Sequence, residues 1–272
     1  MPTAAVNGVS LHYETHGWER DADVVVLSNG VLMSTAGWVN QASVLSARYR
    51  VLLHDCRGMW KSEHPPGPYT LDLHADDLMA LLDHLGVERA HLAGISYGAE
   101  ISLTCAIRHP DRVASLFLSS VVACPDPLLR AQIQAWIRAA ELEDPELLWS
   151  LVYAASFSPG WAAAHPEELA AGRRRYAALD FRSAGELFRA FLRFDVTEDL
   201  GRVTAPALFV AGDEDALKPQ RHAQLMVQRI VRAEFLVVPG AGHALCLERP
   251  AEFNTALLGF LAKHARGEGG RR

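Results

Sequence analysis

The sequence predicts a doubly wound α/β fold, with a mainly parallel sheet and an inserted helical cap. Short unbroken apolar runs alternate with segments of helical periodicity, and this alternation stops between about residues 126 and 199 before it resumes. Parallel strands are covered on both faces, so they lack the in/out alternation of half-exposed strands. Strands that alternate with helices form one sheet flanked by those helices.

The chain is expected to begin with an edge hairpin. Two β-like runs, at 4–6 and 10–13, flank Asn7-Gly8, a dipeptide that readily supplies the positive φ angles of a tight turn. Six further apolar runs are predicted to be strands of the sheet: 24–27, 51–53, 90–93, 116–118, 207–210 and 235–238.

Helical spacing connects these strands. In the segment 71–85, leucines recur at intervals of three and four while aspartates occupy the opposite face, and helices are also predicted at 219–230 and 251–265. The segment 126–199 lacks strand-like runs and is rich in Trp and Phe. It is punctuated by four prolines, Pro127, Pro145, Pro159 and Pro166. The predicted organisation is core 1–125, cap 126–199, core 200–266 and a frayed tail 267–272.

Composition excludes several classes of protein. The 272 residues are half apolar, so the chain can bury a core, and the net charge of −6 gives no attraction to nucleic acid or anionic lipid. No run approaches the roughly 20 apolar residues that cross a bilayer, and no signal peptide is recognisable, so a cytoplasmic location is expected. The four cysteines lie mostly in apolar runs, which predicts packed thiols rather than disulfides or a metal site.

A candidate nucleophile stands in Gly94-Ile95-Ser96-Tyr97-Gly98. This pentapeptide follows the predicted strand at 90–93 and precedes a helical segment at 99–107. That context is required for a nucleophile elbow, a strained turn that lifts the serine hydroxyl clear of the sheet. A side chain at either glycine would collide with neighbouring backbone. By itself a GxSxG string is often only a glycine-rich turn, so the serine needs a base and a carboxylate.

His243 is the candidate base, because it follows the predicted strand at 235–238 in a loop at the edge where open α/β sheets gather catalytic groups. Three carboxylates, Asp213, Glu214 and Asp215, follow the strand at 207–210. Such clusters are usually solvated, and at most one member need be catalytic. His12 and His16 flank Glu14 in a strand-like segment and do not match a zinc motif.

The whole chain apart from the cap resembles the α/β-hydrolase superfamily, and is similar to its branch of enol-lactone hydrolases, perhydrolase-like esterases and hydroxyacyl-chain acyltransferases. The matching motifs are Leu27-Ser28-Asn29-Gly30, Asp55-Cys56-Arg57-Gly58 with Ser62, the elbow, Gly212 to Asp215, and Gly242-His243 with Glu248 and Pro250. The resemblance implies an α/β-hydrolase fold, selects Asp215 as the acid, and implies oxyanion donors at the backbone N–H groups of Val31 and Tyr97.

Two positions depart from the family pattern. Asn29 stands where many relatives have His, and Trp60 stands where many have Gly, which suits a loop anchor better than a pocket wall. Arg57 is expected to form a structural ion pair with a carboxylate. The run Arg173 to Arg175 is expected to be a solvated helix face, with capture of an anionic carrier as the alternative.

The resemblance implies a serine hydrolase that cleaves an ester, lactone or thioester through an acyl-enzyme on Ser96, without metal or cofactor. Acyl transfer to another acceptor, or a ligand-binding protein with an intact triad, remain alternatives. The expected partner is a small acyl substrate, and the oligomeric state stays open, a homodimer included. A cap-lined apolar acyl pocket for medium-chain esters is predicted from seven aromatic residues of the cap: Trp136, Trp149, Tyr153, Phe157, Trp161, Phe188 and Phe191. The alternative is that these residues only pack the cap's own core. Trp60, outside the cap, is a further candidate for the pocket lining.

Overall fold

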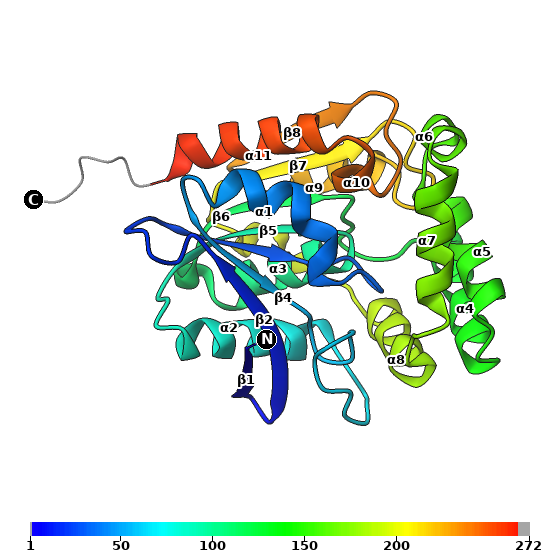
Figure 1. The fold of residues 1–272 in the computed structure, drawn as a ribbon. Helices are drawn as coiled ribbons and strands as arrows, with labels where there is room; N and C mark the ends of the chain where they lie inside the picture. The colour runs from blue at the N-terminus through cyan, green and yellow to red at the C-terminus, as the bar shows by residue number, and fades with distance from the viewer. Residues whose placement is uncertain (1, 266–272) are drawn as a thin grey trace, which may run out of the picture.

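The computed structural model describes residues 2–265, and the tail predicted to fray, 267–272, lies outside them. One sheet runs through the molecule in the order β1-β2-β4-β3-β5-β6-β7-β8 (Figure 1). Its strands are β1 (Thr3–Val6), β2 (Val9–His16), β3 (Val24–Ser28), β4 (Arg50–His54), β5 (Ala90–Ile95), β6 (Val113–Ser119), β7 (Ala207–Gly212) and β8 (Ala233–Val238). The predicted hairpin and all six predicted strands are therefore confirmed.

The sheet is antiparallel only at its N-terminal edge. β1 pairs with β2 and β2 pairs with β4 in antiparallel fashion, whereas every pair from β4 through β3, β5, β6 and β7 to β8 is parallel. The hairpin turns at Asn7 and Gly8, whose φ angles of 46° and 71° are both positive, as the dipeptide predicted. In a parallel sheet the carboxyl ends of the strands share one edge, and this edge carries the candidate site.

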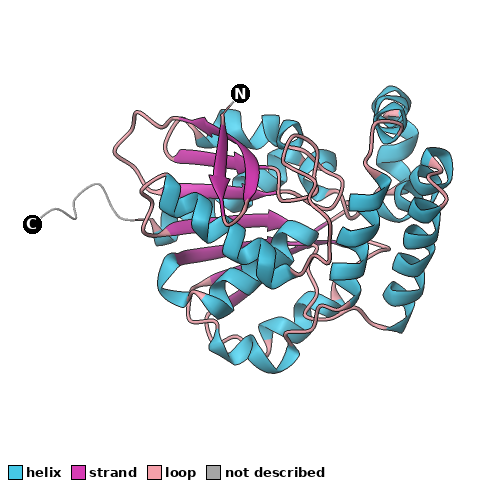
Figure 2. Ribbon diagram, turned by 90° about the horizontal axis from the view of Figure 1, so that it is seen from below, coloured by secondary structure: helices cyan, strands magenta, loops and turns pink. Residues whose placement is uncertain are grey.

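Helices cover both faces of the sheet, as Figure 2 shows. One buried cluster includes side chains of α2, α3 and the cap, and a second includes those of α1 and α11 on the opposite face. The helices of the core are α1 (Val39–Leu45), α2 (Leu71–His84), α3 (Tyr97–Arg108), α9 (Arg221–Val227), α10 (Leu245–Glu248) and α11 (Pro250–His264), with 3-10 turns η1 (Thr35–Trp38), η2 (Pro110–Arg112) and η3 (Thr197–Arg202). The short helix α1 was not predicted.

The cap consists of five helices between β6 and β7, at the carboxyl edge of the sheet (Figure 1). They are α4 (Pro127–Glu141), α5 (Pro145–Ser156), α6 (Pro159–Ala164), α7 (Pro166–Tyr176) and α8 (Phe181–Leu192). Each of the four prolines noted in the sequence begins a helix, where proline loses no intrahelical hydrogen bond. Asp126, Asp144 and Ser158 cap three of these helices by accepting from backbone N–H groups.

No helix within residues 2–265 combines the length and the apolar character required to cross a bilayer.

Candidate active site

Ser96 stands at the turn between β5 and α3 in a strained backbone conformation, with φ 53° and ψ −122°. A non-glycine residue rarely adopts positive φ, and it does so here because the strand must turn sharply into the helix. Gly94 and Gly98 allow this turn: a Cβ at Gly94 would overlap the carbonyl of Gly98, and one at Gly98 would overlap the carbonyl of Ser28. The geometry is that of the predicted elbow.

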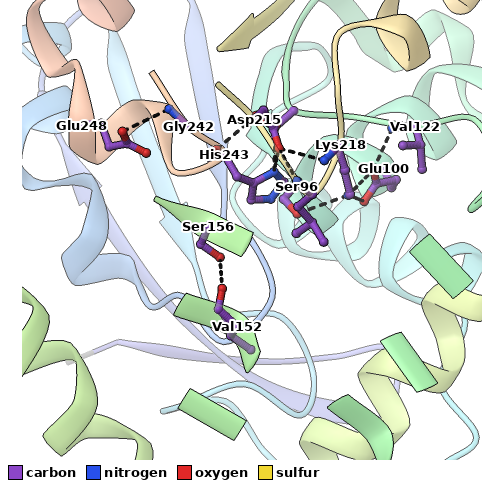
Figure 3. A network of polar contacts seen from close by, with 12 residues as sticks. Ser96, Glu100, Val122, Val152, Ser156, Asp215, Lys218, Gly242, His243 and Glu248 are labelled. Carbon is purple, nitrogen blue, oxygen red and sulfur yellow. Dashed lines mark hydrogen bonds and ion pairs between the residues drawn. The ribbon is translucent and has the colours of Figure 1, made fainter. Parts of the chain in front are cut away.

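His243 and Asp215 form a buried pair at the same edge of the sheet (Figure 3). His243 Nδ1 lies 3.0 Å from Asp215 Oδ2 and 3.2 Å from Oδ1. Asp215 Oδ1 also accepts from the backbone N–H groups of Leu217 (3.0 Å) and Lys218 (2.7 Å). Burial raises the pKa of Asp215, but the charge and hydrogen bond of His243 and the Lys218 N–H outweigh it, so this pKa lies below its ordinary value.

The loop that carries His243 is fastened to the cap by a carboxylate. Glu248 Oε2 accepts from the backbone N–H of Gly242 at 3.0 Å and from that of Ser158, at the start of α6, at 3.2 Å. Ala244 N donates to the carbonyl of Ser156 at 2.9 Å, and Ser120 Oγ donates to the carbonyl of His243 at 3.1 Å. The position of the His243 imidazole is therefore fixed in two ways: Asp215 binds the ring, and hydrogen bonds to the neighbouring backbone fix the loop that carries it.

A second buried charged pair, which sequence reasoning missed, touches the candidate nucleophile. Lys218 Nζ lies 2.7 Å and 2.9 Å from the two carboxylate oxygens of Glu100, and 3.2 Å from Ser96 Oγ (Figure 3). Burial raises the pKa of Glu100, against the opposing effects of Lys218 and the Val122 N–H. Among residues 2–265, the hydrogen-bond partner of the Ser96 hydroxyl is Lys218 and not His243.

A signal for this pair existed in the sequence. Glu100 is the one charged residue in the predicted helical segment 99–107, and it lies one helical turn after Ser96. Lys218 follows Asp215 by three residues, just beyond the Gly212 to Asp215 motif that supplies the acid. Nothing local links the two, because they lie 118 positions apart in the chain.

The two residues assigned as oxyanion donors lie beside Ser96. Tyr97 is the first residue of α3, and Val31 follows β3 in the loop that begins with Asn29-Gly30. Both residues line the small cavity next to Ser96. The N–H groups at the first turn of a helix have no intrahelical acceptor, so the Tyr97 amide suits developing negative charge.

Two cavities adjoin Ser96. The larger, about 620 Å³, lies between the sheet edge and the cap and includes Ser96 and His243 in its lining. The smaller, about 20 Å³, is bounded by Ser96, Lys218 and Glu100 together with apolar side chains. A volume of a few hundred cubic ångströms or more is typical of sites for small molecules.

The predicted pocket aromatics divide between these cavities. Five of them line the larger one: Trp60, Trp136, Trp149, Phe157 and Trp161. Phe188 and Phe191, with Trp136, line the smaller one. Tyr153 requires a correction, because it is not among the lining residues of either cavity and stacks instead on Trp149, with ring centroids 5.5 Å apart. It serves the packing of α5, as a helical insertion needs a core of its own.

Three further expectations concern the charged and aromatic loop residues. Arg57 donates to both oxygens of Asp77 at 2.7 and 2.8 Å, so the structural ion pair is confirmed. Trp60 anchors its loop by donating to the Leu32 carbonyl at 2.9 Å, yet it also lines the large cavity. The run Arg173 to Arg175 is exposed on α7, as expected. Arg175 in addition places its guanidinium over the Trp60 ring, 4.8 Å from the centroid, at the cavity wall.

Neither thiol nor metal chemistry is indicated by the described residues. Cys246 adjoins the large cavity, but burial raises the pKa of its thiol to about 12, so the reactive thiolate is scarce. Within residues 2–265, no group of three or more His, Cys, Asp or Glu side chains is arranged to hold a metal ion.

A doubly wound sheet with a serine elbow, a His–Asp pair and a helical cap at its carboxyl edge defines a class of hydrolase. The family model of the alpha/beta hydrolase fold matches residues 23–250, and the chain belongs to this family of enzymes. It is 32% identical to a putative carbamate hydrolase RutD of Caulobacter sp. (strain K31), over 97% of this chain and all of the relative. It is 28% identical to 3-oxoadipate enol-lactonase 2 of Acinetobacter baylyi, over 94% of each chain.

Among solved structures, the enol-lactonase from Burkholderia xenovorans LB400 superposes with a TM-score of 0.90 at 29% identity, over 96% of this chain and all of that one. The relatives are hydrolases whose names specify different substrates.

Proposed function

We propose that this chain is a serine hydrolase that cleaves a carboxylic ester, lactone or thioester through an acyl-enzyme on Ser96. The observation that carries the proposal is that Ser96, on its strained turn, and His243 line one cavity, while Asp215 holds His243 Nδ1 at 3.0 Å from behind. A serine hydroxyl is a weak nucleophile until a histidine, oriented by a carboxylate, takes its proton.

In the proposed reaction Ser96 Oγ attacks the substrate carbonyl and His243 takes the hydroxyl proton. The N–H groups of Val31 and Tyr97 bind the oxyanion, and His243 then protonates the leaving group. An acyl-enzyme remains, and water activated by His243 hydrolyses it to the acid and free Ser96. Ser96 Oγ accepts from Lys218 Nζ, so the hydroxyl proton is still available to His243 once it points toward that imidazole.

The relatives support this class of chemistry without fixing its substrate. The names of two relatives specify an enol-lactone and a carbamate, and both compounds present a carbonyl bonded to an oxygen or nitrogen leaving group, which is the kind of carbon that a serine nucleophile attacks. Acyl transfer to an acceptor other than water uses the same acyl-enzyme and remains the second candidate.

A fluorophosphonate probe tests the proposal, because only an activated serine attacks its phosphorus rapidly. Adduct mass is expected on the peptide of Ser96 and is expected to disappear in Ser96→Ala, together with turnover of p-nitrophenyl acetate. Ser43→Ala, on the exposed face of α1, is the matched control and should label like the parent. Undiminished labelling of Ser96→Ala would sink the assignment. Turnover with added alcohols, read as acid against ester product, separates hydrolysis from acyl transfer.

A further inference from the structure

Ser96 lies where the large and small cavities adjoin, and only the larger is lined by the proposed base. Val31, Ser96, Trp136 and Leu217 line both cavities. His243 lines the large cavity and is not among the lining residues of the small one. The small cavity is instead bounded on its polar side by Lys218 and Glu100.

The position of His243 assigns the two halves of the substrate to the two cavities. The leaving group receives its proton from His243 and therefore has to lie on the side of that imidazole. The carbon bonded to Ser96 Oγ also holds the oxyanion, which points to the N–H donors, and the acyl substituent. The acyl substituent therefore has to lie on the side of the carbonyl carbon that faces away from His243 and toward Lys218.

The small cavity is far narrower than the large one. Its volume of about 20 Å³ is of the order of the ~10–15 Å³ that a single water requires. This space suits an acyl group as short as acetyl better than one that carries a propyl chain. The large cavity, at about 620 Å³, accepts a leaving group many atoms long.

The walls of the small cavity resist displacement. The Lys218 ammonium is enclosed by Glu100 at 2.7 Å, by Ser96 Oγ at 3.2 Å and by the Phe191 ring, 4.6 Å from its centroid. Moving it away would leave both charges buried and unpaired, which proteins tolerate poorly. Trp136 and Phe188 are almost fully buried and pack edge-on against each other. An entering acyl chain therefore meets a firm wall rather than a flexible side chain.

From this arrangement we infer that Lys218, held by Glu100, is a specificity-determining residue that restricts the acyl group to about acetyl size, while the larger apolar half of the substrate is the leaving group under the cap. The inference rests on the proposed function. It also revises the expectation of a medium-chain acyl pocket, since the cap aromatics that line the large cavity surround the leaving group instead.

Two isomeric esters test the inference directly. Butyl acetate and ethyl butyrate have the same atoms and similar alkoxide leaving groups, and they differ in which side of the carbonyl carries the longer chain. The parent enzyme is expected to hydrolyse butyl acetate with at least tenfold higher kcat/KM, followed by acid release in a pH-stat. Equal rates, or a preference for ethyl butyrate, would overturn the inference.

A matched pair of double variants assigns the selectivity to Lys218. Lys218→Ala/Glu100→Gln removes the Lys218 side chain from the wall of the small cavity without leaving a buried, unpaired carboxylate at position 100. Lys218→Met/Glu100→Gln removes the same two charges but keeps most of the side-chain volume at position 218. The alanine variant is expected to shift the isomer ratio toward ethyl butyrate by at least tenfold relative to the methionine variant. The ratio of kcat/KM for the two esters is measured within each variant, so a loss of overall rate does not affect the comparison. Equal ratios in two folded variants would remove Lys218 from the role, and a parent without preference for butyl acetate would overturn the acyl restriction whether or not the variants fold.

The probe experiment keeps the two proposals distinguishable. If Ser96 is not labelled and neither ester is hydrolysed, the proposed function itself has failed. If Ser96 is labelled but butyl acetate is not hydrolysed faster than its isomer, the serine chemistry stands and the acyl restriction is wrong.

Discussion

Asp215 Oδ2 lies 3.0 Å from His243 Nδ1, whereas Asp213, two residues earlier in the same loop, accepts a hydrogen bond from Gly240 N at 2.6 Å. The first carboxylate is buried and the second is exposed. The two carboxylates therefore have different structural roles. Asp215 orients the His243 imidazole, whereas Asp213 stabilises the backbone turn at Gly240.

Replacing Asp215 by Asn is expected to lower kcat by about 10³- to 10⁴-fold, because an amide favours the wrong tautomer of the histidine. Asp213→Asn retains an acceptor for Gly240 N and is expected to change kcat by less than about threefold. Steady-state kinetics with p-nitrophenyl acetate measure both. A larger effect at Asp213 than at Asp215 would mean that the acid has been misassigned.

Glu248 offers a test of how the base is positioned. Its Oε2 accepts both backbone N–H groups while Oε1 has no partner among residues 2–265. Glu248→Ala leaves two buried donors unpaired, at roughly 1–3 kcal/mol each, and is expected to lower both Tm and kcat. Glu248→Gln supplies one carbonyl oxygen, which is all that the two donors use, and should retain most activity. An alanine variant with unaltered kcat would show that His243 is positioned without the link to the cap.

The sequence predicted those parts of the fold and site that local patterns encode. The parallel interior strands are mainly apolar runs, interrupted at His91 in β5 and Ser115 in β6, and the elbow is recognisable because Gly94 and Gly98 are needed wherever a strand turns so sharply. Helix α1 was missed because it is short and its apolar residues do not mark one face: its buried side includes the polar Gln41, while Val39 is 67% exposed. β8 was predicted as an apolar run, but its residues before the buried Val238 alternate between exposed and half-buried, since it is an edge strand.

The rest of the site depends on contacts between distant segments. Lys218 and Glu100 acquire their role only when the loop after β7 meets α3, and neither residue signals this meeting on its own. The cap aromatics were recognised as a group, but their division between two cavities follows from how α4, α5 and α8 pack. Tyr153 stacks within the cap, whereas Phe157 lines the large cavity. Amino-acid composition does not distinguish these two roles.

Arg57 is expected to support stability and not catalysis. Its guanidinium pairs with the buried carboxylate of Asp77 and donates to the carbonyl of Asn7 at 3.1 Å. Arg57→Met leaves the buried Asp77 carboxylate with the Asn7 amide but without its cationic partner, which costs about 3–5 kcal/mol, equivalent to a fall in Tm of roughly 10 °C. The kcat of the folded fraction should not change. Arg108→Met, which breaks an exposed pair with Asp76, is the control and should cost less than about 1 kcal/mol.

The burial of His74 leads us to expect that the folded protein loses stability in mild acid. It is buried on α2 with both ring nitrogens unpaired within residues 2–265, its ring between those of Tyr69 and Tyr97 at 5.8 and 5.5 Å. Burial, with a smaller effect of Arg57, lowers its pKa from 6.5 to about 3. Below pH 6.5 the His74 imidazole therefore binds a proton in the unfolded chain but stays neutral in the folded protein. The free energy of unfolding consequently falls as the pH drops from 6.5 toward 3.

At pH 5 the penalty from His74 amounts to about 2 kcal/mol. His54, whose pKa burial lowers to about 4, adds a penalty of the same sign. His74→Leu removes the first group while keeping an apolar side chain, so urea denaturation at pH 7.5 and pH 5.0 should give a difference between the two pH values about 2 kcal/mol smaller than in the parent. His84→Leu, exposed at the end of the same helix, is the control and should leave that difference unchanged. If His74→Leu loses as much stability between these pH values as the parent, His74 is not held neutral by burial, and the acid sensitivity must originate elsewhere.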